Sequence, residues 1–149
     1  MSSSHVGVEL RRLVALRADR LCEYCLIHED DTYFGCEVDQ IISEKHGGPT
    51  DAENLAYACL PCDRHKGSDL GSITVSGEFR RFFNPRTDRW GDHFRLDDSA
   101  ILPLDEIGEV TTRIFHLNHE DRVLERQTLR RSGRYPTPAA LSRSGTSSA

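Results

Sequence analysis

Two Cys-x-x-Cys pairs, Cys22/Cys25 and Cys59/Cys62, constrain what this chain can fold into more than any other feature. A two-residue gap lets both sulfurs of one turn point at the same ion, and zinc takes four such ligands in a tetrahedron. The 33 residues between the pairs (26–58) exceed the 15–20 of a compact zinc ribbon. We therefore expect zinc to join the two ends of a small folded unit, with no ligand position open for chemistry.

The alternative is that the same four cysteines form disulfides in an oxidising compartment. The first 12 residues, MSSSHVGVELRR, contain no apolar stretch of the kind found in secretory signals. No apolar run approaches the roughly 18 residues needed to cross a bilayer. We therefore expect a cytoplasmic protein without membrane contact, in which metal binding is favoured over disulfides.

Length and charge set further bounds. The chain has 149 residues, about one domain's worth, and its 37% hydrophobic content is low enough that a structural metal would help a small core. The formal net charge of −5 argues against nucleic acid, but residues 122–143 hold six arginines and a single acid, Glu125. Arginine suits bidentate phosphate contacts. Codon bias explains the same excess equally well, so both interpretations stay open.

An amphipathic helix is predicted before the first cysteine pair. Apolar residues recur there at helical spacing, while arginines occupy the other faces. The apolar stripe comprises Val6, Leu10, Leu13, Val14 and Leu21. We expect this stripe to pack against the zinc unit.

Between the cysteine pairs the sequence predicts a strand, a loop, a second strand and a short helix. Residues 33–42 (YFGCEVDQII) are rich in β-branched and aromatic residues, and residues 55–58 form the second strand. The loop between them carries a Gly-Gly pair, which favours a turn. Asp63 stands in the first turn of a helix that Gly67 ends.

Beyond residue 70 the patterns predict strands at 73–83 and 94–104, then a helical segment at 105–131 with Asn118 as an interruption. The apolar face of that segment comprises Val110, Ile114, Leu117 and Leu124. We expect the neighbouring aromatic residues, Phe82, Phe83, Trp90 and Phe94, in the core. The predicted domain is 1–133, and the Pro-, Ser- and Ala-rich residues 134–149 are expected to form a disordered tail.

Three runs of this sequence resemble zinc-stapled HNH endonucleases. The runs are RADRLCEYC, CEVDQIISEKHGGPTDAENLAYACLPCDRHKGSDL and FFNPRTDRWGDHF. The family motif carries Asp-His-Ile at the end of its first strand, Gly-Gly in the loop, Asn-Leu before the second strand and Lys-Gly at the helix. The resemblance covers residues 17–67 closely. It implies an α+β fold, with a ββα-metal core at about residues 17–70 held by a four-cysteine zinc site, an N-terminal helix and a C-terminal extension of strands and helices.

The resemblance also implies hydrolysis of DNA phosphodiester bonds with magnesium or another divalent ion. Asp39 would be a ligand of that ion, and Asp63 stands where the family's last His or Asn binds it. Asn54 would hold the loop in shape. Arg64 and Lys66 would contact DNA phosphates, although both also suit a solvated helix face. Without the resemblance, Asp39 reads as an ordinary exposed acid.

Gln40 departs from the family pattern because it stands at the position of the general-base histidine. A carboxamide orients a water but accepts no proton near neutral pH, and losing a general base costs about 10²- to 10⁴-fold in rate. His46, in the adjoining loop, is the candidate replacement base. Strict alternation also places Asp39 and Gln40 on opposite faces unless the strand ends or bulges there.

Two functions follow from these observations. The first is a metal-dependent HNH endonuclease that is slow or uses a replacement base. The alternative is a catalytically inactive zinc module, derived from the same fold, that binds DNA or protein through the same surface. The acidic pair Asp39 and Asp63 favours retained binding of a divalent ion.

Overall fold

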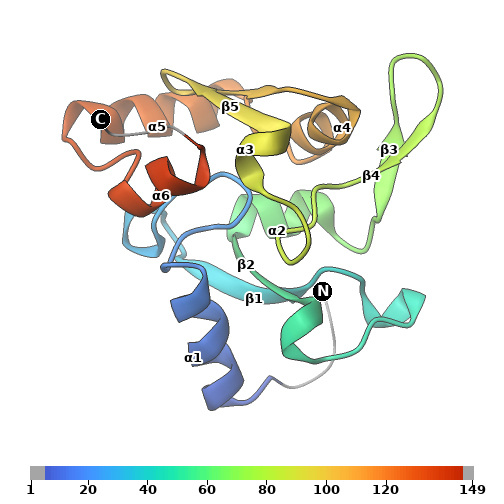
Figure 1. Cartoon of the computed structure of the whole chain (residues 1–149). Helices are drawn as coiled ribbons and strands as arrows, with labels where there is room; N and C mark the ends of the chain where they lie inside the picture. Colours follow the sequence, from blue (N-terminus) through green and yellow to red (C-terminus); the bar gives the residue numbers. More distant parts are fainter. Residues whose placement is uncertain (1–5, 146–149) are drawn as a thin grey trace.

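The structure is a computed structural model that describes residues 6–145, a mixture of helices and three antiparallel hairpins, β1–β2, β3–β4 and β5–β6 (Figure 1). The helices are α1 (Val8–Arg17), α2 (Leu60–Lys66), α3 (Trp90–His93), α4 (Glu106–Ile114), α5 (Glu120–Arg131) and α6 (Pro138–Arg143). The strands are β1 (Cys36–Gln40), β2 (Leu55–Cys59), β3 (Gly71–Ile73), β4 (Phe79–Arg81), β5 (Phe94–Asp97) and β6 (Ala100–Pro103). The α+β prediction is confirmed.

The β1–β2 hairpin and α2 form the unit between the cysteine pairs. Gln40 pairs with Leu55 at one end of the hairpin, and Cys36 pairs with Cys59 at the other. Helix α2 follows β2 directly and ends at Gly67, whose φ of +54° and ψ of −131° suit glycine. The two strands and the short helix agree with the prediction. Strand β1 is shorter than expected, because it begins only at Cys36.

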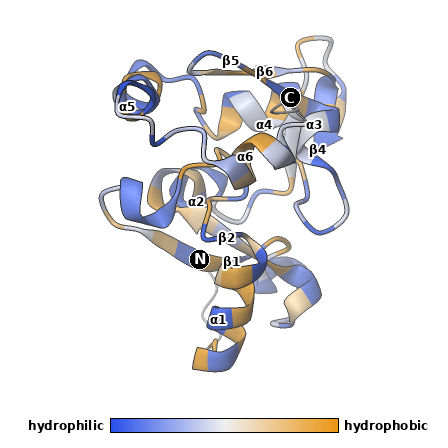
Figure 2. Ribbon diagram, turned by 60° about the vertical axis from the view of Figure 1, so that its left-hand side comes forward, coloured by the Kyte–Doolittle hydropathy of each residue, from blue (hydrophilic) through white to orange (hydrophobic). Residues whose placement is uncertain are grey.

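Helix α1 packs on this hairpin through a narrow apolar stripe. Val14, Ala15 and Ala18 are buried against Leu55 and Tyr57 of β2. Leu13, predicted in the buried stripe, is instead 48% exposed. The correction follows from helix geometry, because residues 14, 15 and 18 already fill the face that meets the sheet, and residue 13 is rotated about 100° from residue 14. Figure 2 shows hydrophobic and hydrophilic residues side by side along α1.

A second core connects the first cysteine turn to the C-terminal half, and α2 lies between the two regions (Figure 1). The ring centroids of Tyr24 and Phe115 are 4.9 Å apart, and the indole nitrogen of Trp90 donates to the carbonyl of Tyr24 at 2.9 Å. The four aromatic residues predicted in the core are buried: Phe82, Phe83, Trp90 and Phe94. The C-terminal half therefore supports the first cysteine turn directly.

The predicted helix 105–131 is two helices, separated around Asn118. The side chain of Asn118 accepts from the amide of Ile101 and donates to its carbonyl, at 2.9 and 2.7 Å, so it serves β6 rather than a helix. The break changes which face of α5 turns inward. Leu124, predicted in the apolar face, is 56% exposed, whereas Arg126 is fully buried and donates to the carbonyls of Ser99 and Leu117.

The arginine-rich run is used largely within the fold. Arg126 donates to backbone carbonyls, and four other members form ion pairs: Arg122 with Glu125 at 3.8 Å, Arg130 with Asp98 at 2.7 Å, Arg134 with Asp31 at 2.6 Å, and Arg143 with Asp19 at 3.1 Å. These contacts give the arginines structural partners that the sequence did not reveal. Most of the run thus has partners within the fold, while Arg131 and Arg134 remain exposed.

The chain after residue 133 differs from the expected disordered tail. Tyr135 is 3% exposed, and its hydroxyl donates to the carbonyl of Cys25 at 2.9 Å. Helix α6 follows, capped by the hydroxyl of Thr137. A buried tyrosine anchors this segment in spite of its composition. Residues 146–149 lie outside the described residues. Within residues 6–145, no helix has the length and apolar character needed to span a membrane.

Replacing Tyr135 with phenylalanine tests this anchor. The Cys25 carbonyl would lose its buried donor, which costs about 1–3 kcal/mol of unfolding free energy. Chemical denaturation of the Tyr135→Phe variant at constant zinc measures it. A variant as stable as the original would show that the tail adds nothing to the fold.

Candidate functional site

The four paired cysteines converge within the second core. Their sulfurs all lie within 4.8 Å of one another, and the sulfurs of Cys25 and Cys59 are 3.6 Å apart. A zinc ion with 2.3 Å bonds requires sulfur–sulfur edges of about 3.8 Å, so the quartet fits the ion. A disulfide requires about 2.05 Å, and all five cysteines are free. The fifth cysteine, Cys36, is half-buried and outside the quartet.

A buried arginine contacts this quartet. Arg122, at the start of α5, is 8% exposed and donates to the sulfurs of Cys59 at 3.5 Å and Cys62 at 3.9 Å. Burial alone would lower the pKa of Arg122, but the surrounding cysteine thiolates more than offset this and raise it. Four thiolates around Zn²⁺ leave a net charge of −2, and Arg122 reduces it. No sequence pattern indicates this contact, because Arg122 follows Cys62 by 60 residues.

The two predicted carboxylates meet. Asp39 comes from β1 and Asp63 from the first turn of α2, and they are 8% and 4% exposed. The pKa of Asp63 is raised to about 7, mainly by burial and secondly by a hydrogen bond and charge repulsion from Asp39. Two converging carboxylates are a suitable donor set for magnesium, which binds one or two of them and fills its other positions with water and phosphate oxygens. The structure thus brings together the two residues expected to hold a divalent ion.

Lys66 is not on the surface, contrary to its predicted role as a phosphate contact. It is 3% exposed, and its Nζ donates to the backbone carbonyl of Gln40 at 3.2 Å. Burial lowers the pKa of Lys66, and Asp39 and Asp63 oppose that shift. Arg64, on the same helix, is exposed as expected. The correction follows from α2 geometry: Lys66 follows Asp63 by three residues and shares its inward face.

Gln40 is the last residue of β1, so the alternation of the strand ends where the site begins. Its side chain is 2% exposed, and Nε2 donates to the hydroxyl of Thr50 at 2.7 Å. Oε1 is buried and has no hydrogen-bond partner among the described residues. A buried acceptor without a protein partner is normally satisfied by an ordered water. Oε1 is therefore the acceptor of this side chain that the described residues leave unused.

The loop between the strands is fixed by Asn54 and Gly48. The Asn54 side chain accepts from the amide of Ile42 at 2.9 Å and donates to the carbonyls of Ile42 and Pro49, both at 2.8 Å. A Cβ atom on Gly48 would lie 1.6 Å from the Ile42 carbonyl oxygen, so no other residue fits there. This geometry agrees with a loop-holding function for Asn54.

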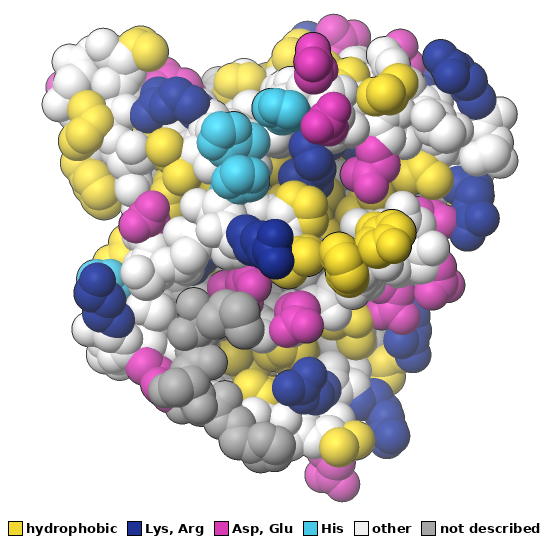
Figure 3. Space-filling model, turned by 180° about the vertical axis from the view of Figure 1, so that it is seen from behind, with side chains coloured by type: hydrophobic (Ala, Val, Ile, Leu, Met, Phe, Trp, Pro, Cys, Tyr) yellow, Lys and Arg dark blue, Asp and Glu magenta, His cyan; other side chains and the backbone are white. Residues whose placement is uncertain are grey.

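The two histidines nearest to the acid pair in the sequence, His46 and His65, lie in different surroundings. His46 lies exposed on a 3₁₀ turn, Glu44–His46, in the loop after β1. His65, on the outer face of α2, stacks on His116 with ring centroids 4.2 Å apart. Figure 3 shows histidines gathered on one face, bordered by both basic and acidic side chains. In residues 6–145, the metal-ligating group of three or more side chains is the cysteine quartet, and His46 does not join the acid pair in such a group.

The arrangement is thus an antiparallel hairpin and a short helix that present two carboxylates beside a four-cysteine metal site. Residues 22–69 match the HNH endonuclease family, which confirms for this segment the resemblance seen in the sequence. No curated protein and no solved structure matches the chain.

The cysteine quartet yields a direct test. Zinc bound by four thiolates contributes an apparent ~10–16 kcal/mol, more than the usual net stability of a domain. We expect purified protein to contain one zinc per chain and Cys59→Ser to unfold or aggregate. Elemental analysis and circular dichroism measure both. Cys36→Ser is the matched control, because Cys36 is outside the quartet, and it should keep both zinc and fold. Folded protein without zinc would contradict this.

The acid pair predicts a pH-dependent cost. A carboxyl whose pKa is raised in the folded state contributes stability below its ordinary pKa, and that contribution is lost as the pH rises through about 7. In magnesium-free buffer at pH 8, Asp63→Asn should therefore raise the free energy of unfolding by roughly 1–4 kcal/mol.

Magnesium should stabilise the original protein at pH 8 more than the Asp63→Asn variant. Urea denaturation at several pH values, with zinc kept saturating, measures both effects. Equal responses to magnesium would show that Asp63 holds no divalent ion.

Proposed function

We propose that this protein is an HNH-type endonuclease that hydrolyses DNA phosphodiester bonds with magnesium or another divalent ion. The observation that carries the proposal is the meeting of Asp39 and Asp63 in one buried pair, directly beside the cysteine site. The match of residues 22–69 to the HNH endonuclease family supports the reaction class. The partner would be DNA, and the proposed location is the cytoplasm.

Each residue of the site would have a distinct role in this reaction. Asp39 and Asp63 would bind the divalent ion, which supplies charge stabilisation at the scissile phosphate and the leaving oxygen. Oε1 of Gln40 would accept a hydrogen bond from the attacking water and orient it. Lys66 offsets part of the charge of the acid pair and holds the Gln40 backbone. Asn54 holds the loop between β1 and β2 through its contacts with Ile42 and Pro49.

Proton acceptance is the weak step of this site. Gln40 cannot take the proton of the water, and the resulting loss is about 10²- to 10⁴-fold. His46, exposed in the loop after β1, is the proposed replacement base. Arg64, exposed on α2, is the remaining candidate of the predicted pair for a phosphate contact.

The alternative function is an inactive zinc module that binds DNA or protein. The observation that favours it is Gln40, whose buried amide is held by Thr50 and lacks a titratable group. The zinc site, the fold and the outer face of α2 would serve such a module equally well. The two functions differ in magnesium-dependent chemistry, which decides between them.

Restoring the base tests the proposal. Gln40→His should raise magnesium-dependent nicking of plasmid DNA by a factor within the ~10²–10⁴ range of general-base catalysis. Adding Asp63→Ala should abolish that activity, because the ion would lose a ligand. Gel assays of highly purified protein, with zinc content checked for each variant, measure both.

The controls separate the two functions. His46→Ala in the original protein should reduce residual nicking if His46 takes the proton, and leave it unchanged if Gln40 only positions water. A Gln40→His variant that is folded, zinc-loaded and still inert would overturn the nuclease proposal and favour the binding module.

A further inference from the structure

We propose that a cavity beside the acid pair binds one unstacked nucleobase of the DNA substrate, which makes unpaired or distorted DNA the preferred substrate class. This inference rests on the proposed function. The cavity has a volume of about 300 Å³. Its walls are formed mainly by Ile42, Lys66, Leu70, Phe79, Phe82 and Asn84.

The cavity and the candidate catalytic site share a wall. Lys66 lines the cavity, and the same side chain extends to the Gln40 carbonyl and lies in the field of both carboxylates. Ile42, also in the wall, belongs to the loop that Asn54 holds. A strand whose phosphate lies at Asp39 and Asp63 therefore has a neighbouring base next to the cavity.

The lining matches a planar aromatic ring. The walls are almost entirely apolar, and Phe79 at the rim is 57% exposed, whereas Phe82 is buried at 5%. An exposed phenylalanine presents a face on which a base can stack. Asn84 and Asp69 add polar groups that can meet the edge of a base. A volume of about 300 Å³ is at the lower end for a small-ligand site. It is too small to hold a helix, whose diameter with side chains is roughly 10 Å.

The ring of Phe79 is held in place by the hairpin. A Cβ atom on Gly71 would lie 2.6 Å from the Cζ atom of Phe79, so the glycine leaves the space that the ring uses. Gly71 and Phe79 belong to the paired strands β3 and β4. The stacking face is therefore positioned before any ligand arrives.

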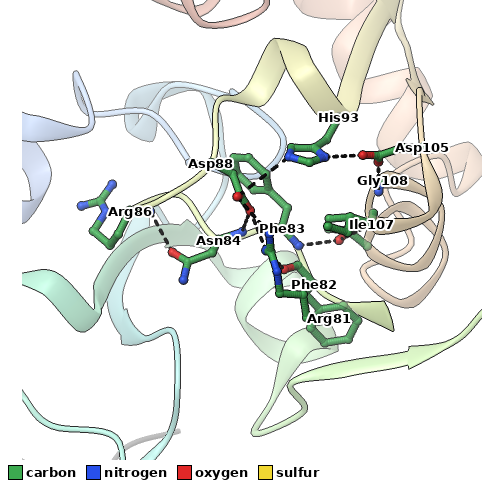
Figure 4. Close-up of polar contacts among 11 residues, drawn as sticks. Arg81, Phe82, Phe83, Asn84, Arg86, Asp88, His93, Asp105, Ile107 and Gly108 are labelled. Carbon is green, nitrogen blue, oxygen red and sulfur yellow. Dashed lines mark hydrogen bonds and ion pairs between the residues drawn. The ribbon is translucent and has the colours of Figure 1, made fainter. Parts of the chain in front are cut away.

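The part of the wall formed by Arg81 and Asn84 is held by a polar network around Asp88 (Figure 4). Asp88 accepts two hydrogen bonds from the guanidinium of Arg81, at 2.7 and 3.0 Å, and one from the amide of Asn84 at 2.9 Å. His93 lies between Asp88, at 3.9 Å, and Asp105, at 2.7 Å. A wall ordered in advance lowers the entropic cost of binding.

A base within a regular duplex cannot enter such a cavity, because it is paired and stacked on both faces. It enters only from a single strand, a gap, a mismatch or a nucleotide turned out of the helix. Stacking on an aromatic ring tolerates all four bases. The cavity thus predicts a preference for DNA structure over DNA sequence.

Fluorescence of 2-aminopurine tests this, since stacking quenches its emission. The probes are a 2-aminopurine single strand, a gapped duplex with the base unpaired, and the matched duplex, each titrated with full-length protein in calcium. We expect quenching and tighter binding for the first two. Phe79→Ala should weaken their binding about 5- to 150-fold, the range found when a stacking side chain is truncated, and Phe79→Tyr should retain it.

Val75→Ala is the matched control, because Val75 is 89% exposed on the same hairpin and outside the cavity wall. It should bind as the original does. Equal affinity for all probes, or an unchanged Phe79→Ala variant, would overturn the cavity's role, while magnesium-dependent nicking would still support the nuclease. Phe79-dependent binding without nicking by any variant would support the base-binding cavity and overturn the nuclease. No binding of any probe would overturn both.

Discussion

Four cysteine sulfurs from two distant segments meet within 4.8 Å, and the remaining structure depends on that meeting. Cys59 ends β2 and Cys62 lies in α2, so an ion held there fixes how the helix leaves the hairpin. Asp63 follows Cys62 directly, and its position against Asp39 is set by the same turn. A metal held by the four cysteines would thereby also set the geometry of the acid pair, which offers different ligand atoms.

Charge balance is the second condition, because both sites concentrate negative charge in a buried region. Arg122 donates to the sulfurs of Cys59 and Cys62, and Lys66 lies beside the two carboxylates. Unpaired buried charges would cost several kcal/mol each. Arg122 belongs to α5 and Lys66 to α2, so the C-terminal half and the nuclease-like segment each supply one cation to this buried region. Residues 22–69 match the family, yet their metal site is completed by contacts from outside that segment.

The C-terminal half contacts the first cysteine turn at several points. Trp90 donates to Tyr24, Tyr135 donates to Cys25, and Phe115 packs on the ring of Tyr24. The same half supplies the walls of the cavity beside the acid pair through β4 and the loop that follows. Support of the metal-binding turn and formation of the proposed base-binding cavity are thus two consequences of one packing arrangement.

The sequence alone determined the features that are local in the chain. Three predictions rest on chemistry within a few residues, and the structure agrees with them. They are the pairing of the sulfurs within Cys22–Cys25 and Cys59–Cys62, the two hairpin strands, and the end of α2 at Gly67. Tertiary packing decided the rest. Lys66 turned inward, Arg122 reached the thiolates, Leu13 and Leu124 faced solvent, and Tyr135 anchored a segment whose composition predicts disorder. The contacts of Lys66 and Tyr135 depend on partners 26 and 110 residues away in the sequence. The exposure of a helical leucine depends on which face of the helix meets the core. Local residue spacing predicts neither the distant partner nor the buried face.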